Sequence, residues 1–295
     1  MRFLKYLALS ILLFVSFACR KEEKNPTPAD GPKVKFVVKI DGEQQRLDNL
    51  GQPSQIPAGH AAQTPTFNGI AAHYIELSQS AFTAVGHGAI IYHAPEVEEG
   101  GPLAVDFDQT KVVKDGEVIF EMPLHQFPAG KYEFARVSIV YQNYDVSFTA
   151  MGMNMQSTIA SFVGFNTFIR SHKVRQLTDV VNGNRMQGYW AWETHPNGVL
   201  TEPQLQTGQS AGTTVPNPIA GTSPIPPGSC LVTGAFAERL EISGNETEDV
   251  IIELSFSVNN SFEWKDDNGN GLFEPLEDEQ VVDMGLRGLI AKRVQ

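Results

Sequence analysis

A run of acidic and amide residues near the C-terminus has the spacing of a calcium-binding loop. Residues 266–277 read DDNGNGLFEPLE, which fits the twelve-residue pattern D-x-[DN]-x-[DN]-G-x5-E. Calcium takes about six to eight oxygen ligands, and the alternating side chains of Asp266, Asn268 and Asn270 can supply three of them. Gly271 permits the sharp turn of such a loop. The spacing therefore predicts a bound calcium ion.

The second half of the loop would complete the calcium shell. The carbonyl of Leu272 is the next ligand, and Glu274 stands at a position that often binds through water. Glu277 would close the shell with both carboxylate oxygens. In a protein exposed to the extracellular medium, such a site is expected to stabilise structure.

Two features set this loop apart from a paired helix-loop-helix. Residues 250–264 before it have strand character, so we expect a hairpin. Pro275 restricts the backbone, so that Asp278 or Glu279 is an alternative to Glu277 as the closing ligand. An acidic Asn-Gly hairpin without an ion is the other interpretation.

Three methionines alternate with other residues at Met151, Met153 and Met155. On a strand, a period of two would place the three thioethers on one face. Soft sulfur ligands suit Cu(I), so copper is one candidate cofactor. Flexible packing of apolar side chains is the other explanation, and we favour it.

Two tryptophans, Trp190 and Trp192, also alternate, and His195 follows them. On one strand face, the indoles could form a platform for a sugar ring or part of a soft-metal site. A buried aromatic layer is the favoured alternative. Other histidines gather in the first third of the chain, without a His-x-His or H-E-x-x-H spacing that would support zinc; they are His60, His73, His87 and His93.

Little in the sequence predicts catalysis. Residues 208–212 read GQSAG and match G-x-S-x-G, but prolines 203 and 216 flank them where a strand and a helix are required. We therefore expect a protein that is not an enzyme. A glycan-acting enzyme stays open as an alternative, and it would need two carboxylates facing each other across a cleft.

The residues around these motifs predict an all-β fold. Apolar and polar residues alternate in short segments separated by turns such as Asp41-Gly42 and Asn182-Gly183. We expect an antiparallel β-sandwich with long loop insertions and a calcium-loop-like hairpin near the C-terminus. The expected strands cover residues 33–40, 70–77, 89–93, 116–123, 132–141, 187–192, 231–236, 250–258 and 286–290.

The domain organisation follows from the same pattern. Residues 33–295 form one β-sandwich domain, with a split near residue 150 as the alternative. Residues 157–168 fit either a short helix or a connection. Residues 201–229 are rich in Thr, Gly, Pro and Gln, so we expect a long surface loop.

The N-terminus predicts export and lipidation. Arg2 and Lys5 precede a short apolar run at residues 7–17, which is too short to span a bilayer and fits a signal peptide of residues 1–18. The sequence Ser16-Phe17-Ala18-Cys19 resembles a bacterial lipobox, which implies acylation of Cys19 and membrane attachment. Polar, Pro-rich residues 19–32 would form a flexible tether.

The tether also bears on location. Residues 21–23, Lys-Glu-Glu, resemble the export signal of Bacteroidota surface lipoproteins, which implies the outer face of the outer membrane. The periplasmic leaflet is the alternative. A net charge of −12 excludes general nucleic-acid binding, because no basic surplus neutralises phosphates.

Four short motifs lie along the body, namely Pro128-Ala129-Gly130-Lys131-Tyr132, Arg136-Val137, Trp190-Ala191-Trp192 and Ser257-Val258-Asn259. Their order resembles that in the β-sandwich of methanobactin-associated copper-binding proteins. The resemblance implies a copper site that uses histidines with Trp190 or Trp192. Where that family has a Gly-Tyr element, this chain has Glu193-Thr194-His195-Pro196.

Together, these features predict a lipid-anchored surface protein that binds a ligand or partner, or serves a structural role, with calcium stabilising it. The identity of that ligand or protein partner does not follow from the sequence. A copper-binding envelope protein and a glycan-acting enzyme are the alternatives.

Overall fold

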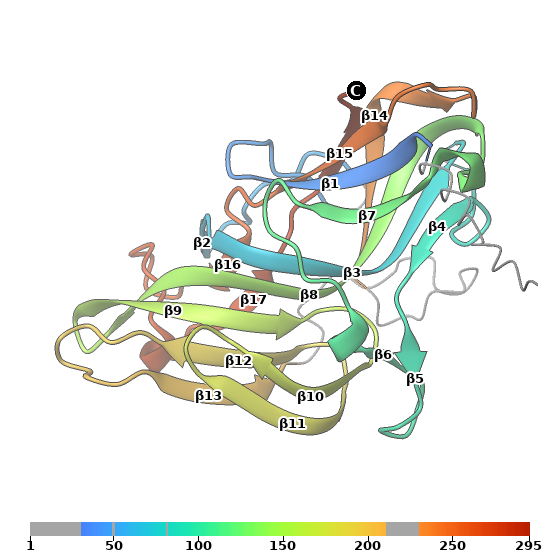
Figure 1. Ribbon diagram of the computed structural model, residues 1–295. Coiled ribbons are helices and arrows are strands. Elements are labelled where there is room, and N and C mark those ends of the chain that lie inside the picture. Colours follow the sequence, from blue (N-terminus) through green and yellow to red (C-terminus); the bar gives the residue numbers. More distant parts are fainter. Residues whose placement is uncertain (1–30, 49–50, 81, 211–229) are drawn as a thin grey trace, which may run out of the picture. The chain divides into compact units, whose positions relative to one another are not determined.

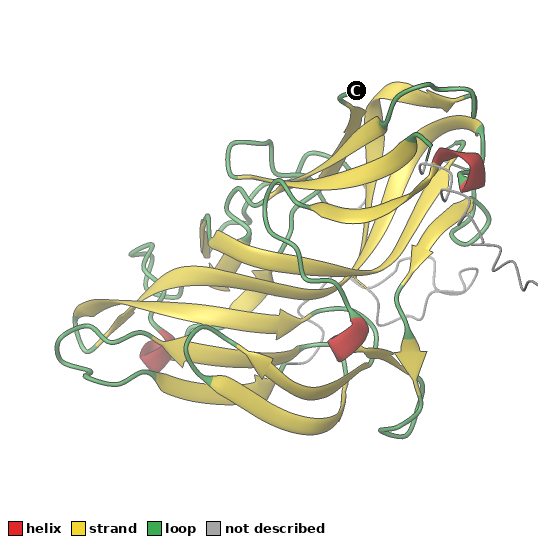
Figure 2. Cartoon of the chain, viewed as in Figure 1, coloured by secondary structure: helices red, strands yellow, loops and turns green. Residues whose placement is uncertain are grey.

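The all-β prediction is confirmed in a computed structural model, which describes residues 31–48, 51–80, 82–210 and 230–295 (Figures 1 and 2). Nearly every regular element in these ranges is a strand. The helical elements described are three single-turn 3-10 helices at Phe107–Gln109, Leu124–Gln126 and Pro275–Glu277. The predicted Cys19 lipidation and the signal peptide lie outside the described residues.

An 11-stranded sheet carries most of the structure. Its main path joins nine strands, in the order β13 (Gln204–Gln209), β12 (Tyr189–Thr194), β9 (Met153–Phe162), β8 (Gly130–Ala150), β14 (Cys230–Ile242), β18 (Leu289–Arg293), β15 (Val250–Ser257), β1 (Lys33–Asp41) and β7 (Val118–Pro123). Two more strands branch from β8, namely β3 (Thr66–Ser78) and, paired to it, β4 (Ala89–His93).

Strand β8 is the longest, with 21 residues, and it organises the sheet. One of its edges pairs with β14 up to Ile139 and then with β9 from Tyr141 onward, while its other edge pairs with β3. The β8–β9 hairpin closes at Met151 and Gly152, with φ of 51° and 72°. Positive φ at both central residues suits the type I′ turn, whose twist matches that of the strands.

Two smaller sheets complete the layers. One has the order β11 (Thr178–Arg185), β10 (Thr167–Lys173), β6 (Ala104–Asp106), β5 (Glu96–Val97), and the other has β17 (Val281–Met284), β16 (Phe262–Lys265), β2 (His60–Gln63). Apolar residues of β10 and β6, including Ile169 and Val105, pack with Phe162 and Ala191 of the large sheet. Sheets packed face to face in this way form a sandwich.

The sheets are not purely antiparallel, which corrects part of the prediction. Strand β1 pairs in parallel with β15, from Val34 opposite Val250 to Asp41 opposite Ser257. Strands β10 and β6 are also parallel. Alternation of apolar residues predicts strands but not their direction, because it reports only which face is buried.

Three local predictions change as well. Residues 157–168 form the end of β9, a connection at 163–166 and the start of β10, so the helix alternative is wrong. Residues 204–209 form edge strand β13 within the expected loop. Asn182-Gly183 lies inside β11, where Asn182 has a φ of 48° and the β10 pairing shifts register. The rest of that expected loop, residues 211–229, lies outside the described residues.

Residues 31–295 cluster as one compact unit, and β8 and its hairpin with β9 continue across position 150. Within the described ranges, no helix is long and apolar enough to cross a bilayer.

Candidate functional site

Residues 266–280, called the acidic loop below, join β16 to β17. These two strands are an antiparallel pair, so the loop closes the hairpin that the sequence predicts. Its first half is folded by its own side chains. The Asp266 carboxylate accepts hydrogen bonds from the backbone N–H of Asn270 at 3.1 Å and of Gly271 at 3.0 Å. The Asn268 side-chain oxygen accepts from Asn270 N–H at 3.0 Å. The Asp266 and Asn268 oxygens therefore meet around one backbone amide.

The closing carboxylate beside this group is that of Glu279. Glu277 lies exposed in the 3-10 turn, and Asp278 adopts a left-handed conformation, with a φ of 64°, that redirects the chain. Glu279 is only 6% exposed, and its Oε2 accepts a hydrogen bond from Glu274 N–H at 2.7 Å. Its Oε1 is buried without a hydrogen-bond partner among the described residues.

Charge accumulates around Glu279. Burial raises the pKa of this carboxyl group, and the negative charges of Asp266, Glu274 and Asp267 raise it further. A buried carboxylate facing like charges is unfavourable unless a cation compensates it. The arrangement fits the alternative in which Glu279 replaces Glu277 as the closing calcium ligand.

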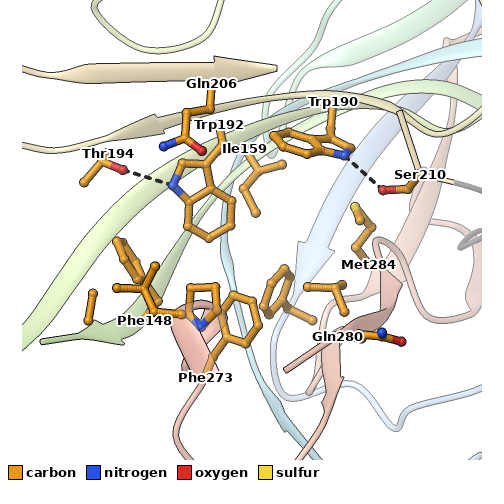
Figure 3. A pocket seen from close by; sticks show the side chains of 15 residues that line it. Phe148, Ile159, Trp190, Trp192, Thr194, Gln206, Ser210, Phe273, Gln280 and Met284 are labelled. Carbon is orange, nitrogen blue, oxygen red and sulfur yellow. Dashed lines mark hydrogen bonds between the residues drawn. The ribbon is translucent and has the colours of Figure 1, made fainter. Parts of the chain in front are cut away.

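A pocket of about 590 Å³ lies beside the acidic loop (Figure 3). Trp190 and Trp192 line it from one face of β12. The Trp190 Nε1–H donates to Ser210 Oγ at 2.9 Å, and the Trp192 Nε1–H donates to Thr194 Oγ1 at 3.1 Å. Because both indole N–H groups are satisfied, the rings can present their apolar faces to a ligand.

Gly208 on β13 makes room for the Trp190 ring. The two residues are cross-strand partners, and a Cβ at Gly208 would lie 2.4 Å from Trp190 Cζ2. No side chain larger than hydrogen fits with the indole in this position. The position of the Trp190 ring therefore depends on the glycine opposite it.

The opposite wall of the pocket comes from the acidic loop and the segment after it. Phe273 is 4% exposed, and its ring centroid lies 5.2 Å from that of Phe262 and 6.2 Å from that of Trp192. Its carbonyl accepts from Thr149 N–H at 2.7 Å. The wall continues through Pro275, Leu276, Gln280, Val281 and Met284, of which Figure 3 labels Gln280 and Met284.

The three methionines do not share one strand. Met151 lies in the hairpin turn and is 79% exposed, because the chain reverses there. Met153 and Met155 lie on β9, and both pack in the aromatic cluster around Phe262 and Trp264. Their positions fit the packing interpretation.

His195 follows β12 but faces a cation. Arg175 Nη1 lies 2.6 Å from His195 Nδ1 and 2.7 Å from Nε2, and Thr158 Oγ1 lies 2.8 Å from Nε2. Burial and the Arg175 charge lower the pKa of His195. A guanidinium at both ring nitrogens opposes the approach of a metal ion.

A second cluster of potential ligands was not predicted from the sequence. His73 on β3, His93 at the end of β4 and Glu96 at the start of β5 offer ligand atoms that all lie within 4.8 Å of one another. A hydrogen bond from His73 lowers the pKa of Glu96. No spacing motif could have found the cluster, because β3 and β4 meet only through sheet pairing.

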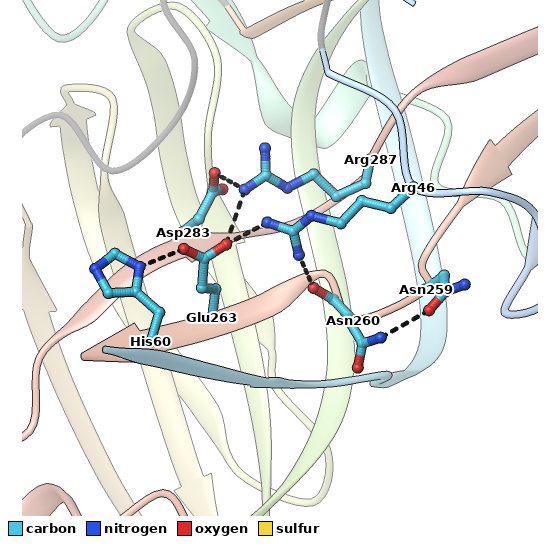
Figure 4. Close-up of polar contacts among 7 residues, drawn as sticks. All are labelled: Arg46, His60, Asn259, Asn260, Glu263, Asp283 and Arg287. Carbon is cyan, nitrogen blue, oxygen red and sulfur yellow. Dashed lines mark hydrogen bonds and ion pairs between the residues drawn. The ribbon is translucent and has the colours of Figure 1, made fainter. Parts of the chain in front are cut away.

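A buried ionic network stands on the three-stranded sheet (Figure 4). Glu263 on β16 pairs with Arg46, with Arg287 at 3.5 Å and with His60 Nδ1 at 2.6 Å. Asp283 on β17 pairs with Arg287, and burial raises the Asp283 pKa to about 6. Each carboxylate of the network has a cationic partner, which fits a structural role.

Two other buried carboxylates hold loops in place. Glu193 accepts hydrogen bonds from the backbone N–H groups of residues 175–177 at 2.9–3.0 Å. Glu76 accepts from Gly86 and Gly88 and lies 3.6 Å from Arg136. Both side chains are fully buried, so they serve as anchors for backbone donors.

Comparisons with known proteins add no relative. A scan of protein-family models, a search of curated proteins and a search of solved structures each find no match for this chain.

Proposed function

We propose that this protein is a non-enzymatic, lipid-anchored binding protein of the bacterial envelope whose ligand site is the pocket of Trp190 and Trp192. One observation carries the proposal: the two indoles face a loop wall across a cavity of about 590 Å³. That volume is within the range of small-molecule sites.

The lining supports a neutral ligand with one flat apolar face. Apolar side chains dominate, and the amides of Gln206 and Gln280 and the hydroxyls of Thr194 and Ser210 supply polar contacts. A pyranose ring has this chemistry, with C–H groups on its faces and hydroxyls at its rim. We therefore propose a saccharide ring as the occupant, stacked on an indole.

Calcium would hold the loop wall of this pocket. Phe273 connects the acidic loop to the aromatic cluster, and Pro275 and Leu276 line the cavity just after it. An ion bound by Asp266, Asn268, Asn270 and Glu279 would fix the ends of this segment. The unpartnered Oε1 of the buried Glu279 supports a cation there.

The experiment that tests the ligand site is a tryptophan-fluorescence titration with neutral pyranosides in calcium-containing buffer. We expect saturable quenching in the wild type and its loss in Trp192→Ala. Val180→Ala is the matched control, because Val180 is 67% exposed on β11, outside the pocket lining. A pocket that binds free indole as an added ligand, and from which no pyranoside displaces it, would contradict the saccharide proposal.

The envelope location rests on the N-terminal sequence. The charged residues 2 and 5, the apolar run and Cys19 together support a cleaved leader and an acylated cysteine. Intact-mass measurement of the native protein tests this. We expect a mass without residues 1–18 and with added acyl chains; a native chain that keeps its leader or lacks acylation would contradict it.

Copper binding through Trp190, Trp192 and His195 has less support. The indoles line the pocket, whereas His195 lies against Arg175. Hydrolysis of a glycan also has less support. The buried carboxylates Glu193, Glu76 and Glu263 are held by backbone donors or by cations.

A further inference from the structure

We propose that His73, His93 and Glu96 bind one divalent transition-metal ion of the Zn²⁺, Cu²⁺ and Ni²⁺ class. This site is separate from the acidic loop and from the aromatic pocket, because it is built by β3, β4 and β5. Two imidazoles and a carboxylate form a donor set that such ions prefer.

The spacing of the donor atoms suits a common ion. Glu96 Oε1 lies 2.9 Å from His73 Nε2 and 3.7 Å from His93 Nε2. Ligands about 2.1 Å from a tetrahedral zinc ion lie roughly 3.4 Å from one another. The two distances bracket this value, so small side-chain rotations complete the arrangement.

The backbone fixes two of the three ligands. Ala94 N–H donates to the His73 carbonyl at 2.7 Å, which ties the end of β4 to β3. Next to it, His93 Nδ1–H donates to the Ala94 carbonyl at 3.0 Å. This hydrogen bond places the proton on Nδ1 and leaves the lone pair of His93 Nε2 available for a metal ion. A backbone carbonyl commonly selects the metal-binding nitrogen of a histidine in this way.

The burial of His73 is a second, independent observation. Its side chain is 2% exposed and stacks on Phe165 at 5.7 Å, and its Nδ1 has no hydrogen-bond partner among the described residues. An apolar residue would fill this position without an unsatisfied nitrogen. The ring therefore gains its polar contact only on the Nε2 side, where Glu96 lies.

The site has an open side. His93 is 48% exposed, and the Glu96 side chain is 21% exposed. Solvent can therefore supply the remaining ligands, and an ion can enter directly. An ion bound at His73 Nε2 replaces the hydrogen bond to Glu96, and the proton of that nitrogen moves to Nδ1, which has no hydrogen-bond partner among the described residues.

The test is a titration of the metal-stripped protein with Co²⁺, followed by Zn²⁺ and Cu²⁺, in an excess of calcium that occupies the acidic loop. We expect one equivalent of Co²⁺ with visible d–d absorption and displacement by Zn²⁺. Bound Cu²⁺ should show nitrogen hyperfine coupling in its electron paramagnetic resonance spectrum. Each bound ion should raise the melting temperature.

Variants distinguish this site from adventitious binding. His93→Ala and Glu96→Gln should each weaken Co²⁺ binding at least about tenfold. Losing a residue that only supports a metal ligand already costs about tenfold, and losing a ligand costs more. Both positions are partly exposed, so both variants should fold. His125→Ala, an exposed histidine outside the cluster, is the control and should bind as the wild type does. Equal Co²⁺ affinity in His93→Ala and wild type, or no binding in the wild type, would overturn the proposal.

Discussion

The Phe273 ring lies 6.2 Å from the Trp192 indole, and this contact joins the acidic loop to the sheet. Phe273 belongs to the acidic loop, and Trp192 belongs to strand β12. The same two rings line the pocket. Order in the acidic loop and the shape of the pocket are therefore physically connected.

The first prediction concerns the closing ligand of the loop. Calcium should raise the free energy of unfolding of the wild type by about 2.7 kcal/mol at a concentration 100 times its dissociation constant. Glu279→Gln should lose this effect, whereas Glu277→Gln should keep it, because only Glu279 is buried beside Asp266.

Urea unfolding with and without calcium measures this difference. Terbium luminescence sensitised by Trp264, two residues before the loop, gives a second readout of ion binding. An unchanged calcium response in Glu279→Gln would refute the assignment of this ligand.

The second prediction concerns the aromatic anchor. Phe273→Ala should lower the free energy of unfolding by about 3 to 5 kcal/mol, because it leaves a cavity among Phe262, Trp264 and Trp192. Phe273→Leu should cost less, since it refills most of the volume. Chemical unfolding compares the three proteins. Leu276→Ala, at a side chain that is 64% exposed, is the comparison. If Phe273→Ala lowered the free energy of unfolding by less than Leu276→Ala does, Phe273 would not be an anchor.

The third prediction concerns Gly208. Gly208→Ala should displace the Trp190 indole, because the new Cβ would overlap its ring. We expect a change in tryptophan fluorescence and at least a tenfold loss of pyranoside affinity, whereas Gly198→Ala leaves both unchanged. Gly198 is a suitable comparison for the added methyl group, because a Cβ at that position would have nothing within 4 Å of it. Its φ of 90° lies in the connection between β12 and β13, outside the pocket lining.

The fourth prediction concerns pH. Burial raises the pKa of Asp283 to about 6, above its unfolded value of about 3.9. Between these values the folded state holds the proton more tightly, so the contribution of Asp283 to stability is complete below about pH 4 and is lost as the pH rises through 6.

Asp283→Asn mimics the protonated carboxyl group and removes this dependence. It should match the wild type near pH 4 and exceed its free energy of unfolding at pH 7 by up to about 3 kcal/mol. Urea unfolding across this range tests the difference. A variant that is less stable than wild type at pH 7 would show that the Arg287 ion pair outweighs the burial of the charge.

Local patterns in the sequence determined most strands and the turn that begins the acidic loop. Alternation marked β1 and β4 almost residue by residue. The spacing of Asp266, Asn268 and Asn270 lets their oxygens accept from backbone amides of the same turn. These features depend on residues that are close together in the sequence, so they can be predicted before the fold is known.

Tertiary structure alone decided which distant residues meet. The pairing of β3 with β4 brings His73 to His93, and the left-handed Asp278 turns Glu279 inward in place of Glu277. The pocket likewise needs β12 to lie against the 273–284 segment. Sheet register and chain direction are set by the summed packing of the whole core, which no local spacing encodes.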